Sequence, residues 1–298
     1  MTRPTSVRTG VLLSLTAAFL WGVSGAVAAD AFSEVSPVRV SQVRAMLTAL
    51  ILIPIAVWRD AWRPYGMLGW YALLGVNLAV VNVTFYWAVN RLGVGPGATI
   101  QFLGPILVLV WMAVVQHRPV SGFAWAAAAV AIVGVGLVAQ AWQLEGADWL
   151  GFVAGLASAI TFASYLLLGE HLSHRAPIIT LMTWGFVSAA VLWALVAPLW
   201  SFPTGLSNKV WLELLWVGIL GTAVPFLAEF NALRRIAAGI VGIVATSEPV
   251  FGAAAAWVLL DQQLASVQIL GGIMVIAAVA SIQRWGLPEH EVPYEATR

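Results

Sequence analysis

The sequence predicts an all-α membrane protein with ten transmembrane helices arranged as two inverted five-helix repeats. Three observations support this fold class. Apolar residues make up 61% of the 298 residues and charged residues 9%, whereas soluble domains average roughly 45–50% and 25%. The chain contains ten apolar runs of membrane-spanning length. A pattern in its first half also recurs 144 residues later.

The ten apolar runs are separated by short links that are polar or contain glycine and proline. A helix needs about 20 residues to cross a bilayer. The runs cover about 10–29, 38–58, 66–90, 95–115, 121–140, 149–169, 178–199, 210–232, 239–260 and 266–284. The first run ends in Ala26-Val27-Ala28, which could be a signal-peptide cleavage site. It is longer than a usual signal sequence, so we favour a retained helix.

The internal repeat is clearest between the third and fourth runs and the eighth and ninth. At an offset of 144, residues 86–105 align without a gap with residues 230–249, and Trp21 falls against Tyr165. Five helices is an odd number, so the second unit must enter the membrane from the opposite side. Inverted repeats of this kind are typical of secondary transporters. We expect the units to span residues 10–142 and 148–285.

The positions of lysine and arginine predict the orientation. With the N-terminus inside, ten of the fourteen basic residues lie in inner links or tails, as the positive-inside rule requires. This predicts a multi-pass protein of the bacterial inner membrane with both termini cytoplasmic.

An acid lies deep in the ninth run. Glu248 follows the start of the run by about nine residues, so at 1.5 Å per residue it lies roughly 14 Å deep, near the bilayer midplane. Ionisable residues at that depth are costly and usually functional. Glu248 could bind a proton or a substrate ammonium. Alternatively, it could brace the helix kink at Pro249 by bonding to a neighbouring helix.

Other polar and aromatic residues could line a cavity at the same depth. In the third run Asn82, Tyr86 and Asn90 recur every four residues, which indicates either a water-filled cavity or bonds between helices. Trp21 and Tyr165 could form facing aromatic walls or pack in an interhelical core. The predicted substrate-binding residues are Trp21, Asn82, Tyr86, Gln101, Ser158, Thr161, Tyr165 and Glu248.

A second set of residues is predicted to act in coupling and gating. Glu229 lies near the inner end of the eighth run, where an ion pair with Arg234 or Arg235 would close an inner gate. The predicted coupling and gating residues are Glu229, Glu248, Pro249, Arg234 and Arg235. Arg44 lies about one and a half turns into the second run. We interpret it as structural, either extending to the outer surface or pairing with Asp30 or Glu34.

We predict no catalytic centre, cofactor or metal. The chain has no cysteine, so it has neither disulfides nor thiolate ligands. His171 and His174 have an i, i+3 spacing that could hold a metal, but two ligands without a carboxylate pattern are better interpreted as loop residues. The expected partners are a small-molecule substrate and membrane lipid, with no nucleic acid. The oligomeric state stays open.

Two stretches resemble a known transporter family. They run from Phe85-Tyr86-Trp87-Ala88 to Phe102-Leu103-Gly104-Pro105 and from Ala232-Leu233-Arg234-Arg235-Ile236 to Ser247-Glu248-Pro249-Val250. They resemble the two EamA domains of the drug/metabolite transporter superfamily, over about residues 10–284. The resemblance implies ten helices, cytoplasmic termini, one central cavity and, most commonly, export of amino acids or other small metabolites. The stretch from Gln101 to Pro105 is also similar to the threonine and homoserine exporter branch, where an acid is expected in place of Gln101.

The sequence therefore predicts a secondary transporter that exports amino acids or related small metabolites by alternating access. Proton coupling is one mechanism, and uncoupled exchange or facilitation is the alternative. A membrane-embedded enzyme would need a cluster of His, Asp and Glu at one interface, and the sequence shows no such cluster.

Overall fold

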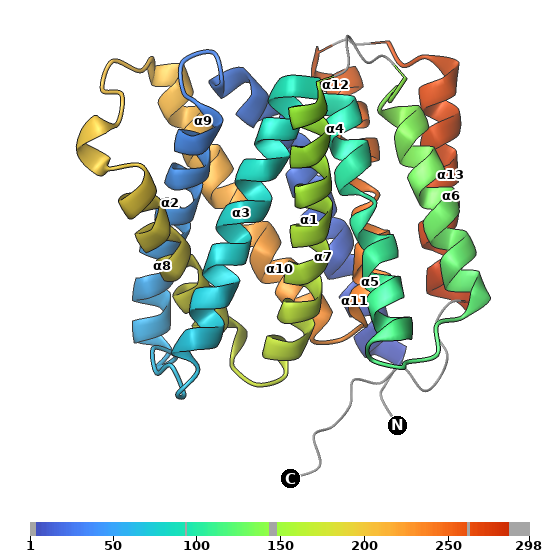
Figure 1. Ribbon diagram of the computed structural model, residues 1–298, viewed down its shortest axis with the longest axis horizontal. Coiled ribbons are helices and arrows are strands. Elements are labelled where there is room, and N and C mark those ends of the chain that lie inside the picture. The colour runs from blue at the N-terminus through green and yellow to red at the C-terminus, as the bar shows by residue number, and fades with distance from the viewer. Residues whose placement is uncertain (1–3, 93, 143–147, 261–262, 286–298) are drawn as a thin grey trace.

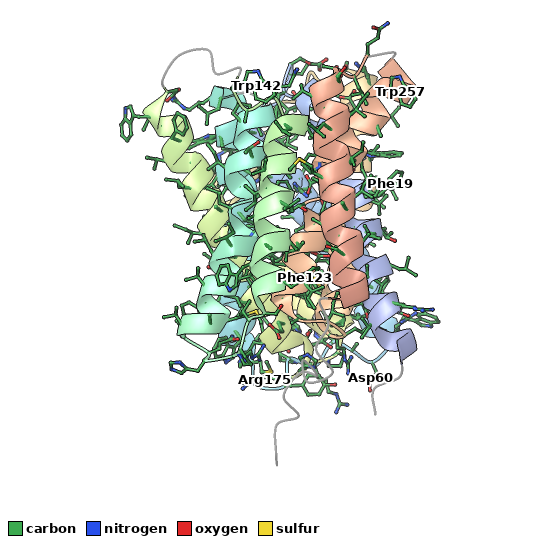
Figure 2. All side chains as sticks on the ribbon, turned by 90° about the vertical axis from the view of Figure 1, so that its right-hand side faces the viewer. Phe19, Asp60, Phe123, Trp142, Arg175 and Trp257 are labelled. Atoms are coloured by element: carbon green, nitrogen blue, oxygen red, sulfur yellow. The ribbon has the colours of Figure 1, made fainter. Side chains whose placement is uncertain are left out.

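The computed structural model describes residues 4–92, 94–142, 148–260 and 263–285. This part of the chain is helical, with no strand. The helices pack side by side in one bundle, and α1 begins at the same end of the bundle where α13 ends (Figure 1). Trp142 and Trp257 lie at the opposite end, while Asp60 and Arg175 lie at the end that α1 and α13 share (Figure 2).

The first half contains three continuous helices, a broken one and a shorter one. They are α1 (Pro4–Ala31), α2 (Pro37–Trp58), α3 (Leu68–Leu92), α4 (Val94–Gln101), α5 (Gly104–Val114) and α6 (Gly122–Val138). The second half contains α7 (Trp149–Ser173), α8 (Ile178–Val196), the 3-10 turn η1 (Leu199–Ser201), α9 (Asn208–Gly218), the π-helix η2 (Ile219–Ala223), α10 (Val224–Leu233), α11 (Ala238–Ala245), α12 (Glu248–Leu260) and α13 (Ser266–Trp285).

Eight helical segments in the described residues are long and apolar enough to cross a membrane. Two shorter apolar helices, Gly122–Val138 and Ser266–Ser281, lie where the fifth and tenth spans were predicted. The chain is therefore a multi-pass membrane protein. The predicted runs four and nine are each broken into two helices, whereas run eight is helical from Asn208 to Leu233 with a π-helical stretch in its middle.

The helix boundaries repeat with the spacing found in the sequence. The helices α4, α5 and α6 begin at residues 94, 104 and 122, and α11, α12 and α13 begin at 238, 248 and 266, which is 144 later in each case. Equivalent helices run in opposite directions, since α1 starts at the lower end of the bundle in Figure 1 and α7 starts at the upper end. Both observations agree with an inverted repeat.

Proline accounts for the break in each repeat. Pro105 and Pro249 lie in the first turn of α5 and α12, where the missing N–H of proline has no helical acceptor to lose. Before the second break, the hydroxyls of Thr246 and Ser247 donate to backbone carbonyls one turn earlier, at 2.6 and 2.7 Å. The break places Glu248 at the start of a helix inside the bundle.

Glycine allows the closest helix crossings. Helices α6 and α13 cross at Gly134 and Gly271, where a Cβ on either residue would lie 2.8 or 2.5 Å from the carbonyl oxygen of the other. Helices α1 and α12 cross at Gly22, where a Cβ would lie 2.5 Å from the Glu248 carbonyl oxygen. Small residues are needed because helices in lipid associate through close van der Waals contact.

Candidate functional site

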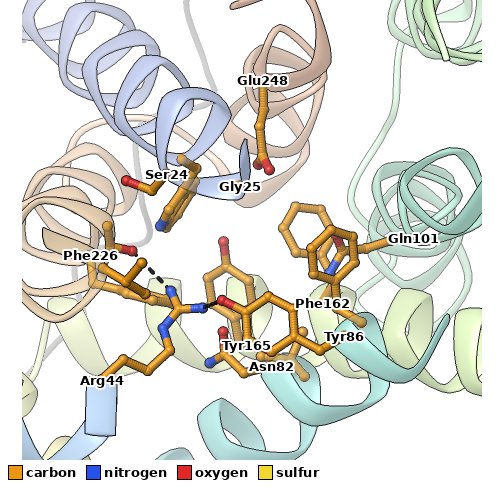
Figure 3. Close-up of a pocket in the computed structure, with 15 residues that line it drawn as sticks. Ser24, Gly25, Arg44, Asn82, Tyr86, Gln101, Phe162, Tyr165, Phe226 and Glu248 are labelled. Atoms are coloured by element: carbon orange, nitrogen blue, oxygen red, sulfur yellow. Dashed lines mark hydrogen bonds between the residues drawn. The ribbon is translucent and has the colours of Figure 1, made fainter. Parts of the chain in front are cut away.

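A cavity lies between the two halves of the chain (Figure 3). It contains about 580 Å³ of empty space, counting the part that is open to solvent. Its wall is formed by α1, α2, α3 and α4 from the first half and by α7, α9, η2, α10 and α12 from the second. The wall includes α2, which the sequence did not suggest.

Six of the eight residues predicted to bind substrate line this cavity. They are Trp21, Asn82, Tyr86, Gln101, Tyr165 and Glu248. They come from five helices of both halves, so the fold gathers residues that are far apart in the sequence. Their role in binding stays a prediction. Further lining residues that we did not predict are Ser24, Arg44, Phe162 and Phe226.

The other two predicted residues lie behind the wall. Ser158 is fully buried, and its hydroxyl accepts a hydrogen bond from the Gln101 amide at 2.9 Å. Ser158 therefore orients a cavity residue and does not face the cavity itself. Thr161 donates to the backbone carbonyls of Ala157 and Ser158 in its own helix, at 2.8 and 3.1 Å.

Aromatic rings close the cavity on one side. Trp21 and Tyr165 do not stack on each other; both pack edge-on against Phe226, with centroid distances of 5.1 and 5.9 Å. Tyr165 also stacks on Phe230 at 6.4 Å and meets Phe162 at 5.2 Å. We call Phe162, Tyr165, Phe226 and Phe230 the aromatic floor.

The predicted surroundings and partners of Arg44 are wrong. Its side chain is buried in the cavity wall with a residue exposure of 7%, so it does not reach the outer surface. The guanidinium donates from Nε to the Thr222 hydroxyl (2.8 Å), from Nη1 to the Tyr86 hydroxyl (2.6 Å) and from Nη2 to the Gly221 carbonyl (2.9 Å). These bonds connect α2, α3 and η2.

The two acids proposed as Arg44 partners have other contacts. The Asp30 carboxylate forms an ion pair with the Lys209 ammonium at 2.5 Å. Glu34 accepts a hydrogen bond from the backbone N–H of Ser207 at 2.7 Å. The Ser207 backbone N–H lowers the pKa of the Glu34 carboxyl. Both contacts connect the C-terminal end of α1 and its following loop to the start of α9, so both acids are occupied away from Arg44.

Pro225 explains why Gly221 can accept from Arg44. In a regular helix, the N–H of residue 225 would bond to the carbonyl of residue 221, but proline has no N–H. The Gly221 carbonyl is left free and the chain forms the π-helix η2. Thr48, one turn after Arg44, donates to the nearby Gly218 carbonyl at 3.1 Å. Pro225 was the available sequence signal, but nothing in the sequence placed Arg44 opposite it.

Glu248 faces the cavity from the start of α12. Its side chain is half-buried, and within the described residues its carboxylate has no hydrogen-bond or ion-pair partner. Arg44 is close enough to act on it electrostatically. A carboxylate that only braced the Pro249 kink would be packed against another helix, so the geometry favours the functional interpretation.

The predicted ion pair of Glu229 is also wrong. Glu229 is fully buried, and neither carboxylate oxygen has a hydrogen-bond partner within the described residues. Arg235 instead donates to the Asn231 carbonyl at 2.5 Å, and Arg234 is exposed. A helix turns about 100° per residue, so arginines five and six positions after Glu229 lie on other faces. Closeness in the sequence did not mean a shared face.

Glu229 has two polar neighbours below the aromatic floor. They are Ser14 of α1 and Tyr165 of α7. In the described part of the chain, their hydroxyls also lack hydrogen-bond partners. We call Ser14, Tyr165 and Glu229 the dry polar cluster. Tyr165 belongs to both the cluster and the cavity wall.

An ion pair closes the lower end of the bundle. Arg118, in the link after α5, contacts Glu170 at 2.9 Å. The other Glu170 oxygen accepts from the backbone N–H of Ala238, at the start of α11, at 3.4 Å. An ion pair had been predicted for Glu229 with Arg234 or Arg235, whereas the pair found at this end joins two other residues.

A second ion pair lies at the upper end. Arg91 contacts Asp148 at 2.6 Å, and its hydrogen bond lowers the pKa of the Asp148 carboxyl. Asp148 also caps α7 by accepting from the N–H groups of Leu150 and Gly151.

Among the residues that the structure describes, no three His, Asp or Glu side chains lie close enough together to hold a metal ion. His171, one of the two histidines considered as ligands, packs its ring against Trp70 with a centroid distance of 5.4 Å.

Comparisons with known proteins identify relatives. The model of the EamA-like transporter family matches residues 8–140 and 149–283. The threonine/homoserine exporter RhtA of Escherichia coli K12 is 26% identical over 90% of this chain and 88% of its own length. The uncharacterized transporter YwfM of Bacillus subtilis is 24% identical over 94% of this chain and 97% of its own length. One crystal structure matches with a TM-score of 0.76 at 18% identity, covering 94% of this chain and 96% of the other, which shows a shared fold.

Proposed function

Because the chain belongs to the EamA-like transporter family, we propose that it is a secondary transporter that exports amino acids or related small metabolites. The observation that supports this most is the cavity, which is lined from both halves and has a glutamate and an arginine in its wall. Transporters built from inverted repeats bind substrate at such an interface. The exporters of threonine and homoserine among the relatives support the amino-acid class.

We propose that the two units superpose in opposite membrane orientations. Their relative movement would open the cavity to one side of the membrane and then to the other. The lining residues of α1 and α3 lie in the second half of each helix, and Arg44 lies in the first half of α2. Helices α1 and α3 run toward the upper end of Figure 1 and α2 runs away from it, so these residues lie in the upper half of their helices. The aromatic floor, the dry polar cluster and the pair Arg118–Glu170 lie below. Export requires this lower side to open.

The proposed location is the bacterial inner membrane with both termini in the cytoplasm. This makes the lower end the inner one and the present conformation outward-facing. Reporter fusions provide the test. A reporter fused after Trp142 should lie outside, and one fused after His174 should lie inside. The reverse pattern would contradict the orientation.

We propose that Glu248 couples transport to a proton or binds the ammonium of the substrate. A carboxylate in a water-accessible cavity near the membrane midplane can serve in either way. Uncoupled exchange is the second candidate mechanism, and it is favoured by the presence of a single acid in the cavity wall within the described residues. An imposed pH gradient separates the two, because only a coupled transporter would accumulate substrate in response.

Counterflow in proteoliposomes tests the proposed function. Vesicles preloaded with unlabelled L-threonine or L-homoserine should take up the labelled amino acid, whereas empty vesicles should not. A nucleobase and a cationic dye serve as comparison substrates. Counterflow of either of these without counterflow of any amino acid would contradict the proposal.

A further inference from the structure

Arg44 is a cation in the cavity wall without an acidic partner. The described residues contain four contacts between basic and acidic side chains, and Arg44 takes part in none of them. Its three hydrogen bonds go to neutral oxygens. A charge held away from bulk water without a counter-charge is unfavourable. An anion that entered the cavity would therefore gain a strong interaction at this position.

The Arg44 guanidinium also has N–H donors that its hydrogen bonds to Thr222, Tyr86 and Gly221 do not use. Arginine carries five N–H donors in one plane, and the three recorded hydrogen bonds leave two of them for another acceptor. The Tyr86 ring lies under the guanidinium with a centroid distance of 5.6 Å, which fixes its orientation. In Figure 3, the Arg44 guanidinium points into the cavity from one side. Guanidinium and carboxylate groups match in shape and charge.

The opposite charge reaches the same cavity from α12. Figure 3 shows the Glu248 carboxylate approaching the cavity from a different side than Arg44. The two groups sense each other electrostatically, yet no direct contact joins them in the described structure. The cavity thus has a positive and a negative group in separate parts of its wall. The rings of Trp21 and Phe226 form apolar parts of the same wall.

We infer that Arg44 and Glu248 form a site for a zwitterion, in which Arg44 binds the substrate carboxylate and Glu248 binds the substrate ammonium. This inference rests on the proposed function and narrows it. The substrate class becomes amino acids in which the carboxylate and the amino group are both free. Amines, amino alcohols and N-acylated amino acids each lack one of the two charges.

A purely structural role for Arg44 predicts a different experimental result. Arg44 connects α2 to η2 by hydrogen bonds, and Thr48 connects α2 to the end of α9 by donating to the Gly218 carbonyl. If that were the only role, substitution of Arg44 would lower stability and reduce the transport of all substrates by the same factor. A carboxylate site requires instead that the preference between substrates changes.

The experiment measures competition during counterflow of labelled L-threonine. The competitors are unlabelled threonine, threoninol, which lacks the carboxylate, and N-acetylthreonine, which lacks the ammonium. For the wild type, we expect threonine to compete at roughly 10- to 100-fold lower concentration than either analogue, the range for losing a hydrogen bond to a charged group. Arg44→Gln should reduce the threonine-to-threoninol ratio to near one and keep discrimination against N-acetylthreonine. Glu248→Gln should do the reverse.

Two further variants separate binding from folding. Arg44→Lys keeps the positive charge and should keep part of the preference for threonine, even if Arg44→Gln does not fold. Arg39→Gln is the matched control, because Arg39 is in the same helix and bonds to the loop at Ala197 and Ser201, away from the cavity. It should keep the wild-type ratio. Each variant is first shown to be folded by its melting temperature in detergent.

The outcomes distinguish the inference from the function on which it rests. Equal competition by threonine and threoninol in the wild type would overturn the inference and leave amino-acid transport standing. An unchanged ratio in folded Arg44→Gln or Arg44→Lys would overturn it as well. Absence of threonine and homoserine counterflow in the wild type would refute the proposed function, and the inference would fall with it.

Discussion

The cavity and the dry polar cluster beneath it each contain one glutamate, and the two glutamates differ in their access to water. Glu248 is half-buried in the cavity wall and feels the charge of Arg44. Glu229 has no exposed surface, and its carboxylate has no hydrogen-bond partner in the described residues. The same side chain therefore has two environments within one bundle. An acid in a membrane protein has to be interpreted from its surroundings and not from its depth alone.

Alternating access would exchange these environments. An ionised carboxylate without partners in a dry core costs several kcal/mol, so an ionised Glu229 would destabilise the closed lower side. Opening of that side would admit water and remove the cost. Glu248 would lose its open cavity in the same movement. Substitutions at and around the two glutamates test whether Glu248 and Glu229 differ in their access to water.

The largest effect is expected for Glu248→Gln. Glutamine keeps the shape and hydrogen-bonding capacity of the side chain but cannot carry a charge. Accumulation driven by an imposed pH gradient should fall at least about tenfold, as for the loss of a charged interaction, while exchange without a gradient survives. The measurement compares both assays on folded protein. Equal gradient-driven accumulation by the variant and the wild type would remove Glu248 from coupling.

A large effect is also expected where α1 crosses α12 behind the cavity. The Cβ added by Gly22→Ala would lie 2.5 Å from the Glu248 carbonyl oxygen and 2.8 Å from the Gly252 nitrogen. Overpacking of this kind costs about 1–3 kcal/mol, so the melting temperature should fall and Glu248 should shift. Gly25→Ala is the matched control, because nothing lies within 4 Å of its added Cβ. A similar loss in both variants would mean that the crossing is not close.

The absence of cysteine from the chain allows the contrast in water access to be measured directly. Ser24 lines the cavity, and Ser14, three turns earlier in α1, belongs to the dry polar cluster. A single cysteine at Ser24 should react with a membrane-impermeant maleimide added from outside, and one at Ser14 should not. Equal labelling of Ser24→Cys and Ser14→Cys would show that water reaches both glutamates.

Glu229→Gln should have a moderate effect. Glutamine cannot ionise, so the closed lower side can no longer be destabilised by a charge at this position. We expect an unchanged or higher melting temperature together with slower transport, because opening becomes less favourable. Glu229→Gln should also leave the threonine-to-threoninol ratio unchanged, which separates it from the cavity variants. A strongly lowered melting temperature would show that the carboxylate has a stabilising partner.

The smallest effect is expected for Arg118→Gln. Its ion pair with Glu170 has one partner that is 39% exposed, and pairs of this kind contribute about 0–1 kcal/mol. The melting temperature should change little. Access to the lower side should nevertheless increase, measured as faster labelling of the single cysteine at Ser14 from the inside. No increase would indicate that the aromatic floor alone maintains the seal.

The helices and much of the cavity could be predicted from the sequence because their signals are local or periodic. Apolar runs define spans, and the offset of 144 pairs the units. Depth within a run then brings residues such as Asn82 and Glu248 to one level, where the fold places them in one wall.

The side-chain partners of Arg44 and Glu229 were predicted wrongly. The sequence did not show which face of a helix each residue lies on, or which backbone carbonyls are free to accept. Arg44 was assigned to nearby acids, but its acceptors are Tyr86 of α3 and two residues of a π-helix, of which Gly221 is 177 positions away in the sequence. Glu229 was paired with arginines that are close in sequence and lie on other faces. Neither the free carbonyl created by Pro225 nor the rotation of α10 is visible in the composition of a run.

Helix α11 connects the lower ion pair to the cavity. Glu170 holds the backbone N–H of Ala238, the first residue of α11. The helix ends at Ala245, three residues before Glu248, after eight residues or roughly 12 Å. Backbone hydrogen bonds along a helix of this length hold its two ends together. A change in what Glu248 binds would therefore reach the contact between Glu170 and Ala238 at the lower end of the bundle through one short helix.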